Sequence, residues 1–251
     1  MGNKSISELI ATLNRRWEFI ECVMDGTDTK RELMAELDRS SSSVYKKAVE
    51  LEAVGLLYRT GSTYTPTVLC QLMIQKREEI ETLWTHREAL STPLPDEIDS
   101  KFFYDAEIVV PGRYTPGRPI DRLNELTENA TRIRGATSVT SQRMMETFHR
   151  QVTEEEIKIE LVLERDLLTH LRTAYPTRFD EVRSMDTLDI LVTDDLPRDL
   201  ISIATPDGKT VGVSLGEDLA DGGIAFSNSW QGTESIESLY DDYTTGAVAF
   251  G

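Results

Sequence analysis

A short segment near the N-terminus gathers the hydroxyl and cationic side chains that are able to contact phosphates and base edges. The run Ser40–Ser43 is followed directly by Tyr45, Lys46 and Lys47. On a helical wheel this polar side lies opposite three apolar positions that fall within about 40° of one another and must face a core: Val44, Ala48 and Leu51. Serine hydroxyls at the positive end of a helix can reach phosphates, and lysines can hold them. The alternative is a helical hairpin whose serines are a cap and solvated surface.

Two helices are predicted before this one. Capping boxes at Ser5-x-x-Glu8 and Thr29-x-x-Glu32 open them, and Asp38-Arg39 forms the turn into the third helix. The first helix ends at Asp25-Gly26 and carries a single apolar stripe: Ile6, Leu9, Ile10, Leu13, Trp17, Ile20, Val23 and Met24.

A hairpin is predicted after the third helix. Residues 55–66 have the pattern strand, turn, strand, with the turn at Thr60-Gly61-Ser62. Three helices and a small hairpin make a winged helix-turn-helix, which places its last helix in the major groove of double-stranded DNA. The hairpin tip would lie along the flanking backbone or minor groove. The predicted DNA contacts are Arg39, Ser42, Ser43, Tyr45, Lys46, Lys47, Arg59 and Ser62.

The charge of the chain is strongly acidic but unevenly distributed. The 251 residues carry a net charge of −17, of which residues 1–75 contribute −1 and residues 76–251 contribute −16. Because the acidic residues are scattered, we interpret them as a means of staying soluble in a salt-rich cytoplasm. The alternative interpretation is that the acidic surface repels nucleic acid. High salt weakens phosphate contacts, so base contacts and shape would supply more of the affinity.

Residues 15–75 resemble archaeal winged-helix regulators of the MarR/ArsR type. The pieces that carry most of the match are Thr29-Lys-Arg-Glu-Leu33 and Leu51-Glu-x-x-Gly-Leu56. Within that group the chain is most similar to haloarchaeal-type proteins whose C-terminal part is related to a methanogenesis-regulator domain. The resemblance implies that the first domain binds operator DNA and that the second senses a signal.

A linker helix is predicted over residues 67–95, between the winged helix (1–66) and a C-terminal domain (96–251). Its inward candidates are Leu69, Leu72, Met73, Ile80, Leu83 and Trp84. If this helix packs on its twin, a homodimer can hold two recognition helices one DNA turn (about 34 Å) apart. The alternative is packing on the chain's own second domain. Ser91-Thr-Pro-Leu-Pro95 breaks the helix and marks the boundary.

The C-terminal domain alternates strands and helices before a run of strands, which predicts an α/β layer with a mixed sheet and makes the chain α+β overall. Strands are expected at 106–110, 132–139, 158–163, 188–192, 200–203, 210–215 and 223–226. Helices are expected at 120–131, 141–152, 165–174 and 235–243.

The order of these elements resembles the phospholipase-D-like domain of some archaeal sugar regulators, but the sequence predicts no catalysis. The resemblance implies that phosphoryl chemistry in this fold would need the motif His-x-Lys-x-x-x-x-Asp. In this chain His149 is followed by Arg150 and Gln151, so the motif is absent. Neither a Gly-x-Ser-x-Gly motif nor a P-loop is present. Asp194-Asp195 and Asp218 with Asp221 are acidic pairs of the kind expected by chance, so we predict no metal site.

An anionic metabolite is the ligand that the C-terminal domain could take through arginines: Arg113, Arg118 and Arg134. The competing interpretation is that these are solvated arginines.

The sequence therefore predicts a transcriptional regulator, dimeric and cytoplasmic, without a cofactor. The alternative is a winged helix that docks protein while the acidic domain keeps DNA away. No stretch approaches the ~20 apolar residues of a membrane span.

Overall fold

The computed structural model describes residues 5–91, 98–153, 157–216 and 222–250. The chain divides into two compact units, Met1–Thr85 and His86–Gly251. The division lies before the predicted boundary at Ser91–Pro95, most of which falls outside the described residues. None of the helices in the described ranges is long and apolar enough to cross a membrane.

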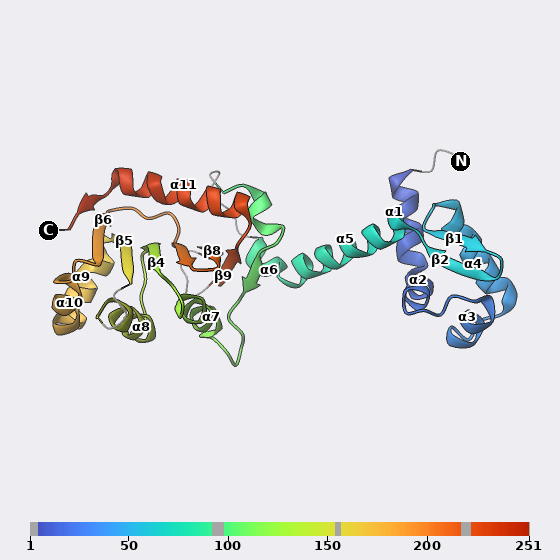
Figure 1. Cartoon of the computed structure of the whole chain (residues 1–251), viewed down its shortest axis with the longest axis horizontal. Coiled ribbons are helices and arrows are strands. Elements are labelled where there is room, and N and C mark those ends of the chain that lie inside the picture. The colour runs from blue at the N-terminus through green and yellow to red at the C-terminus, as the bar shows by residue number, and fades with distance from the viewer. Residues whose placement is uncertain (1–4, 92–97, 154–156, 217–221, 251) are drawn as a thin grey trace. The chain divides into compact units, whose positions relative to one another are not determined.

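The first unit folds as helices followed by a hairpin and one long helix (Figure 1). In chain order its elements are α1 (Ile6–Arg15), α2 (Trp17–Met24), α3 (Lys30–Glu36), α4 (Ser41–Ala53), β1 (Leu57–Thr60), β2 (Thr63–Pro66) and α5 (Val68–Thr85). The strands pair antiparallel, so the predicted winged helix-turn-helix arrangement is present. Its core is one cluster of buried side chains: Leu13, Phe19, Ile20, Val23, Leu33, Leu37, Val44, Ala48, Leu51, Leu56, Leu57, Tyr64 and Cys70.

Local sequence signals set the helix boundaries of this unit. The capping box of α3 is complete, because Thr29 accepts from the Glu32 amide and the Glu32 carboxylate accepts from the Thr29 amide. Asp38 adopts the left-handed conformation in the turn before α4, with φ of 47°. Gly55, with φ of +79°, follows α4 at a position where a side chain would strain the backbone.

The expectation of one continuous first helix is wrong. The helix breaks at Arg16, whose backbone leaves the helical region with φ −113° and ψ 18°. The Arg16 guanidinium holds Glu50 of α4 at 2.7 Å, and the break allows Phe19 to enter the core. Ile6 and Ile10, two members of the expected stripe, are exposed.

The expected inward face of the linker helix is only partly covered within the first unit. Cys70 is the buried residue of α5, and Met73 and Ile74 pack beside it. The other five predicted inward residues are 41–68% exposed: Leu69, Leu72, Ile80, Leu83 and Trp84. Packing of this face on a second copy or on the second domain stays a prediction.

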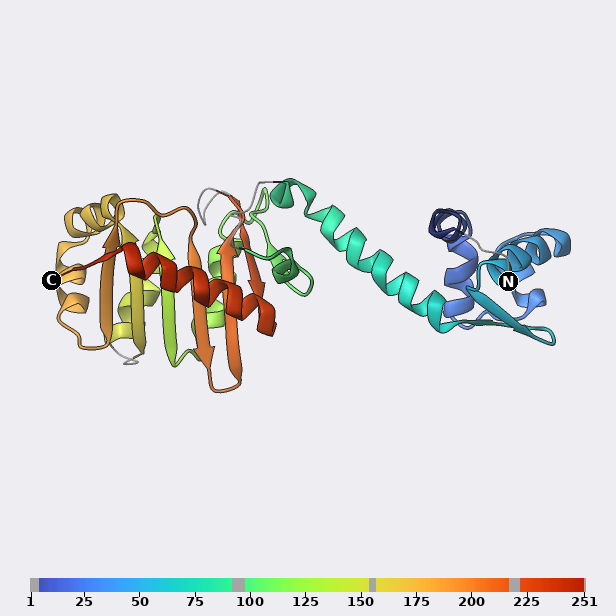
Figure 2. The ribbon, with the colours of Figure 1, turned by 90° about the horizontal axis from the view of Figure 1, so that it is seen from above.

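The second unit is a mixed sheet covered by helices on both faces (Figure 2). Its elements are α6 (Arg87–Leu90), η1 (Ser100–Phe103), β3 (Glu107–Val109), α7 (Arg118–Thr127), β4 (Arg132–Thr137), α8 (Gln142–Thr153), β5 (Lys158–Glu164), α9 (Arg165–Ala174), α10 (Pro176–Arg183), β6 (Leu188–Thr193), β7 (Leu200–Thr205), β8 (Gly208–Ser214), β9 (Ile224–Ser227), α11 (Trp230–Gly246) and β10 (Val248–Ala249).

The strand order is β10-β6-β5-β4-β7-β8-β9-β3. Strands β4, β5 and β6 run parallel because the connections between them contain helices, whereas the other pairs are antiparallel. Figures 1 and 2 show α11 on one face and α7 to α10 on the other. The α+β class and the mixed sheet are therefore as predicted.

Two helices of the second unit differ from expectation. The structure adds α10, which the sequence pattern left unassigned, and α11 begins at Trp230 rather than Ser235. Gly232 weakens the helical signal there but is required, because a Cβ at this position would meet the Ser227 hydroxyl at 2.7 Å. The glycine thus allows the start of α11 to approach β9.

Candidate functional site

Helix α4 presents the predicted polar face to solvent. Ser40 caps the helix by accepting from the Ser43 amide at 3.3 Å, and its hydroxyl lies 3.1 Å from that of Ser42. Ser42, Tyr45 and Lys46 are exposed, while Val44, Ala48 and Leu51 are buried. The period of the helix therefore separates a core face from an outer face as predicted.

The lysines of this face are not neutralised by neighbouring acids. Neither Lys46 nor Lys47 lies within ion-pair distance of a carboxylate among the described residues. The nearby acid Glu50 is bound by Arg16, and this hydrogen bond lowers the pKa of the Glu50 carboxyl. Both lysines thus keep the charge and freedom that contact with an anionic polymer needs.

Tyr45 lies between two cations from different elements. Lys30 Nζ, at the start of α3, is 5.6 Å from the centre of the Tyr45 ring, and the Arg59 guanidinium of β1 is 5.8 Å from it. Lys30 was not among the predicted contacts, because its position beside α4 depends on the packing of α3. The cluster Lys30–Tyr45–Arg59 joins the recognition helix to the hairpin.

The hairpin differs in detail from the prediction. Arg59 lies in strand β1 opposite Tyr64, not at the tip, and it is 3.4 Å from the Glu52 carboxylate of α4. The turn consists of Gly61, with φ of +62°, and the exposed Ser62. Arg39 is exposed in the turn before α4. Arg39 and Ser62 are therefore both exposed, and their contacts with DNA stay a prediction.

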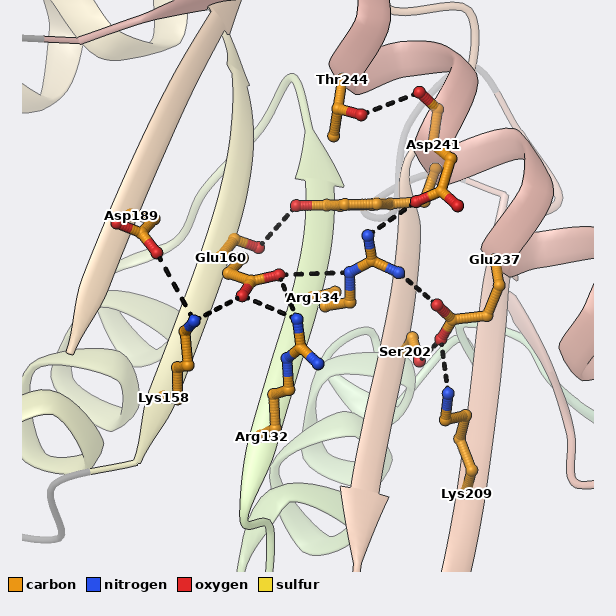
Figure 3. Close-up of polar contacts among 11 residues, drawn as sticks. Arg132, Arg134, Lys158, Glu160, Asp189, Ser202, Lys209, Glu237, Asp241 and Thr244 are labelled. Carbon is orange, nitrogen blue, oxygen red and sulfur yellow. Dashed lines mark hydrogen bonds and ion pairs between the residues drawn. The ribbon is translucent and has the colours of Figure 1, made fainter.

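The second unit carries a network of charged side chains between the sheet and α11 (Figure 3). At its centre the Arg134 guanidinium contacts Glu237, lies 2.7 Å from Asp241, and stacks 4.2 Å from the centre of the Tyr240 ring. Its Nε lies 3.3 Å from Glu160 without hydrogen-bond alignment. The outer cations complete the network: Arg132 at 2.8 Å and Lys158 at 3.0 Å from Glu160, and Lys209 at 3.0 Å from Glu237.

The contacts of the network favour the charged forms of Glu237, Glu160 and Arg134. Burial acts to raise the pKa of Glu237, but hydrogen bonds from Ser202 and Lys209 outweigh it and the pKa lies below its ordinary value. Burial likewise opposes ionisation of Glu160, whose pKa is lowered by Arg132 and Lys158. Burial disfavours the charged Arg134, yet Asp241 and Glu237 raise its pKa. Burial raises the pKa of Tyr240 to about 12.

The predicted three-arginine site for an anionic metabolite is not assembled. Arg134 faces α11 and already has three carboxylate neighbours, whereas Arg118 is the first residue of α7, which covers the opposite face of the sheet. Arg113 is exposed, with its guanidinium 5.5 Å from the Tyr114 ring. The alternation of side chains along β4 sends Arg134 away from the loop arginines.

Neighbouring side chains engage one described member of the acidic pairs and one histidine on α8. Asp194 is bound by Arg165, which lowers the pKa of the Asp194 carboxyl, and Asp221 and Asp218 lie outside the described residues. The ring of His149 on α8 lies 2.7 Å from Glu181 on α10. No group of three or more metal-ligating side chains occurs within the described ranges.

Distant structural similarity extends over most of the chain. TrmBL2, an archaeal chromatin protein that binds DNA, has 15% identity over 98% of this chain and 100% of its own, with a TM-score of 0.44. The phospholipase D family member Nuc from Salmonella typhimurium has 12% identity over 58% of this chain and 99% of its own, with a TM-score of 0.43. NucT from Helicobacter pylori has 11% identity over the same shares, also with a TM-score of 0.43.

A comparison with curated protein sequences finds no match. Residues 116–229 match the family model of the middle domain of the methanogenesis regulatory protein FilR1. The matched segment covers a little under half of the chain and runs from the loop before α7 to the N-cap of α11. Strands β4 to β9 of the second unit and helices α7 to α10 are thus similar to a domain of a regulatory protein.

Proposed function

We propose that this chain is a DNA-binding transcriptional regulator that acts as a homodimer and senses a ligand through its second unit. The observation that carries the proposal is the outer face of α4, where serine hydroxyls, Tyr45 and Lys46 are exposed and the half-buried Lys47 lies beside them, with no carboxylate within ion-pair distance of either lysine among the described residues. The match of the second unit to a domain of a methanogenesis regulatory protein supports the regulatory part.

In this proposal each element of the first unit has a role set by its chemistry. Ser42 and Ser43, at the positive end of α4, reach base edges or phosphates in the major groove. Lys46 and Lys47 bind phosphates. Arg59 contacts the flanking DNA backbone once its ion pair with Glu52 is broken. Lys30 supports Tyr45 from the side of α3.

The affinity for DNA is expected to fall only moderately as the salt concentration rises, because few phosphate contacts are available. Four cations surround the face, namely Lys30, Lys46, Lys47 and Arg59, which corresponds to a slope of log affinity against log salt of roughly −3.5 per subunit. Fluorescence anisotropy with labelled genomic fragments across a KCl series measures this slope. Sequencing of the retained fragments shows whether a motif is enriched. Absence of DNA binding at every salt concentration would favour the protein-interaction module instead.

The apolar side of α5 supplies the proposed dimer contact. Leu69, Leu72, Ile80 and Leu83 lie within an arc of about 80° on the helix and are exposed. The only charge within that arc is Lys76, which pairs with Glu79 at 2.7 Å. A second copy is the occupant we propose, since a winged helix that reads two half-sites needs a symmetric partner.

Replacing Ile80 with Glu is expected to split the dimer. A carboxylate in the middle of the stripe must be desolvated without a partner when two copies associate. Light scattering coupled to gel filtration should then give 28.3 kDa in place of twice that mass. Gln71→Glu adds the same charge on the opposite side of α5 and is expected to leave the dimer intact. A wild-type monomer at micromolar concentration, or an unchanged mass for Ile80→Glu, would refute the contact.

We propose further that the second unit binds its ligand without transforming it. The sequence lacks the His-x-Lys arrangement, and His149 is engaged by Glu181. A phosphodiesterase assay on the purified chain tests this part, because activity that disappears in His149→Ala would identify a hydrolase.

A further inference from the structure

A cavity of about 90 Å³ lies inside the second unit, between the sheet and helices α8, α9 and α10. It separates two clusters of buried side chains on this face of the sheet. One cluster contains Met144, Val152 and Ile201, and the other contains Leu167, Leu171 and Phe179. Side chains of both clusters line the cavity, so the core of this face is interrupted where the clusters meet.

The wall of the cavity is almost entirely apolar. No Asp, Glu, Lys, Arg, Asn or Gln contributes to its described lining, and the polar side chains are Thr137, Thr140 and His149. The Thr137 hydroxyl donates to the Val139 carbonyl at 2.9 Å, and that of Thr140 donates to the Ser141 carbonyl at 3.4 Å. Water inside would therefore find few hydrogen-bond partners.

Protein cores contain few voids larger than a water molecule, so an apolar space of this size needs an explanation. A cavity of ~150 Å³ with an apolar wall takes up benzene, which sets the scale of the molecules that fit. Met144, Met145 and Phe148 of α8 form part of the wall, and methionine side chains adapt to irregular ligands at low cost. The cavity is thus suited to a small guest and is able to widen.

His149 marks the edge of the cavity. Its ring lines the cavity, is 27% exposed, and lies 2.7 Å from Glu181 at the surface. A guest with one polar group is able to place that group beside His149 while its apolar part fills the space between the clusters. An anion is disfavoured, because no Lys or Arg belongs to the described lining and the Glu181 carboxylate stands at the edge.

We propose that this cavity binds a small neutral molecule with an aliphatic or aromatic body, and that this is the ligand class the second unit senses. The sensing role rests on the proposed regulatory function. Binding itself does not, since it can be measured without DNA, so the two proposals fail separately.

Methyl NMR of the full chain labelled at methionine tests the proposal. Xenon, which fits without rearrangement, should shift the methyl signals of Met144 and Met145 in a saturable way. Met24, Met34 and Met73 of the first unit are internal controls and should stay unchanged. Inorganic phosphate should shift none of them. Equal changes at all methionines, or none at Met144 and Met145, would overturn the proposal.

Two substitutions change the volume of the cavity in opposite directions. Phe148→Ala widens it and should bind benzene at least tenfold more tightly than the wild type. Val152→Phe fills it and should abolish the xenon shifts. Leu239→Ala, under α11 on the other face of the sheet, should alter neither result. If Val152→Phe does not fold, Phe148→Ala still decides, because unchanged benzene affinity there contradicts the proposed site. A folded Val152→Phe that keeps the xenon shifts contradicts it equally.

Discussion

The double substitution Lys46→Glu with Lys47→Glu is expected to reduce DNA binding to background while the first unit stays folded. Lys46 is exposed on the outer face of α4 and Lys47 is half-buried beside that face, and the removal of the two breaks no ion pair in the described part of the chain. Reversal replaces two phosphate contacts with two repulsions. The expected loss of affinity is roughly 100-fold or more near physiological salt, and the salt slope should fall by about 2. Anisotropy titrations with genomic fragments measure both quantities.

A matched pair on the second unit controls for net charge. Lys101→Glu with Arg143→Glu makes the same change in charge at side chains that are 58% and 64% exposed. This control should bind DNA nearly as well as the wild type. Equal weakening by both pairs would assign the effect to overall acidity, and an unchanged titration for the α4 pair would remove α4 as the DNA contact. Circular dichroism and a thermal melt verify that both variants are folded.

Replacing Arg134 with Met is expected to destabilise the second unit by roughly 3 kcal/mol, the low end for breaking a buried ion pair. The guanidinium is 20% exposed, and its loss leaves the equally shielded Glu237 with only Lys209 and Ser202 as partners among the described residues. For a unit of this size the loss corresponds to a fall in melting temperature of ~6–12 °C. Urea unfolding and calorimetry measure the two effects.

The other arginine of β4 provides the comparison. Arg132→Met removes a cation that is 48% exposed, so it should cost about 1 kcal/mol or less. Adding Glu237→Gln to Arg134→Met should recover part of the loss, because a neutral amide is easier to bury than a carboxylate that has lost its arginine. Equal costs for Arg132→Met and Arg134→Met would show that the network does not centre on Arg134.

The same network sets the direction of the pH dependence. The folded-state pKa of Glu237 and that of Glu160 are lowered, so their contribution to stability is complete above the unfolded value of about 4.3. It is lost as pH falls below that value through the folded-state pKa. The urea midpoint of the wild type should therefore drop more steeply in this acidic range than that of Arg134→Met with Glu237→Gln. Parallel curves would contradict the assignment.

Local patterns were sufficient for much of the first unit. The 3.6-residue period of α4 placed Val44 in the core and Lys46 outside, because a helix repeats its faces regardless of what it packs against. The capping box of α3 and the glycine after α4 are set by backbone chemistry within a few residues. The same holds for the strands of the second unit, whose apolar runs are bounded by turn residues.

Patterns within one segment were insufficient wherever the outcome depended on a distant segment. The break at Arg16 serves a contact with Glu50, thirty-four residues away in the chain. Lys30 joins the α4 face only through the packing of α3, and most of the apolar stripe of α5 is exposed outside the core of the first unit. A wheel or a periodicity shows which residues share a face but not what covers that face.

The hydroxyl and cationic face of α4 was determined by the sequence itself, because residue type, helical period and caps are all local properties. The tertiary structure alone decided the surroundings of that face, where the charges of Lys30 and Arg59 converge on Tyr45. It also decided that Arg134 binds the carboxylates of α11 rather than an anionic ligand, and that two core clusters leave an apolar cavity between them. Strand order and sheet face bring these residues together from positions that no local pattern connects.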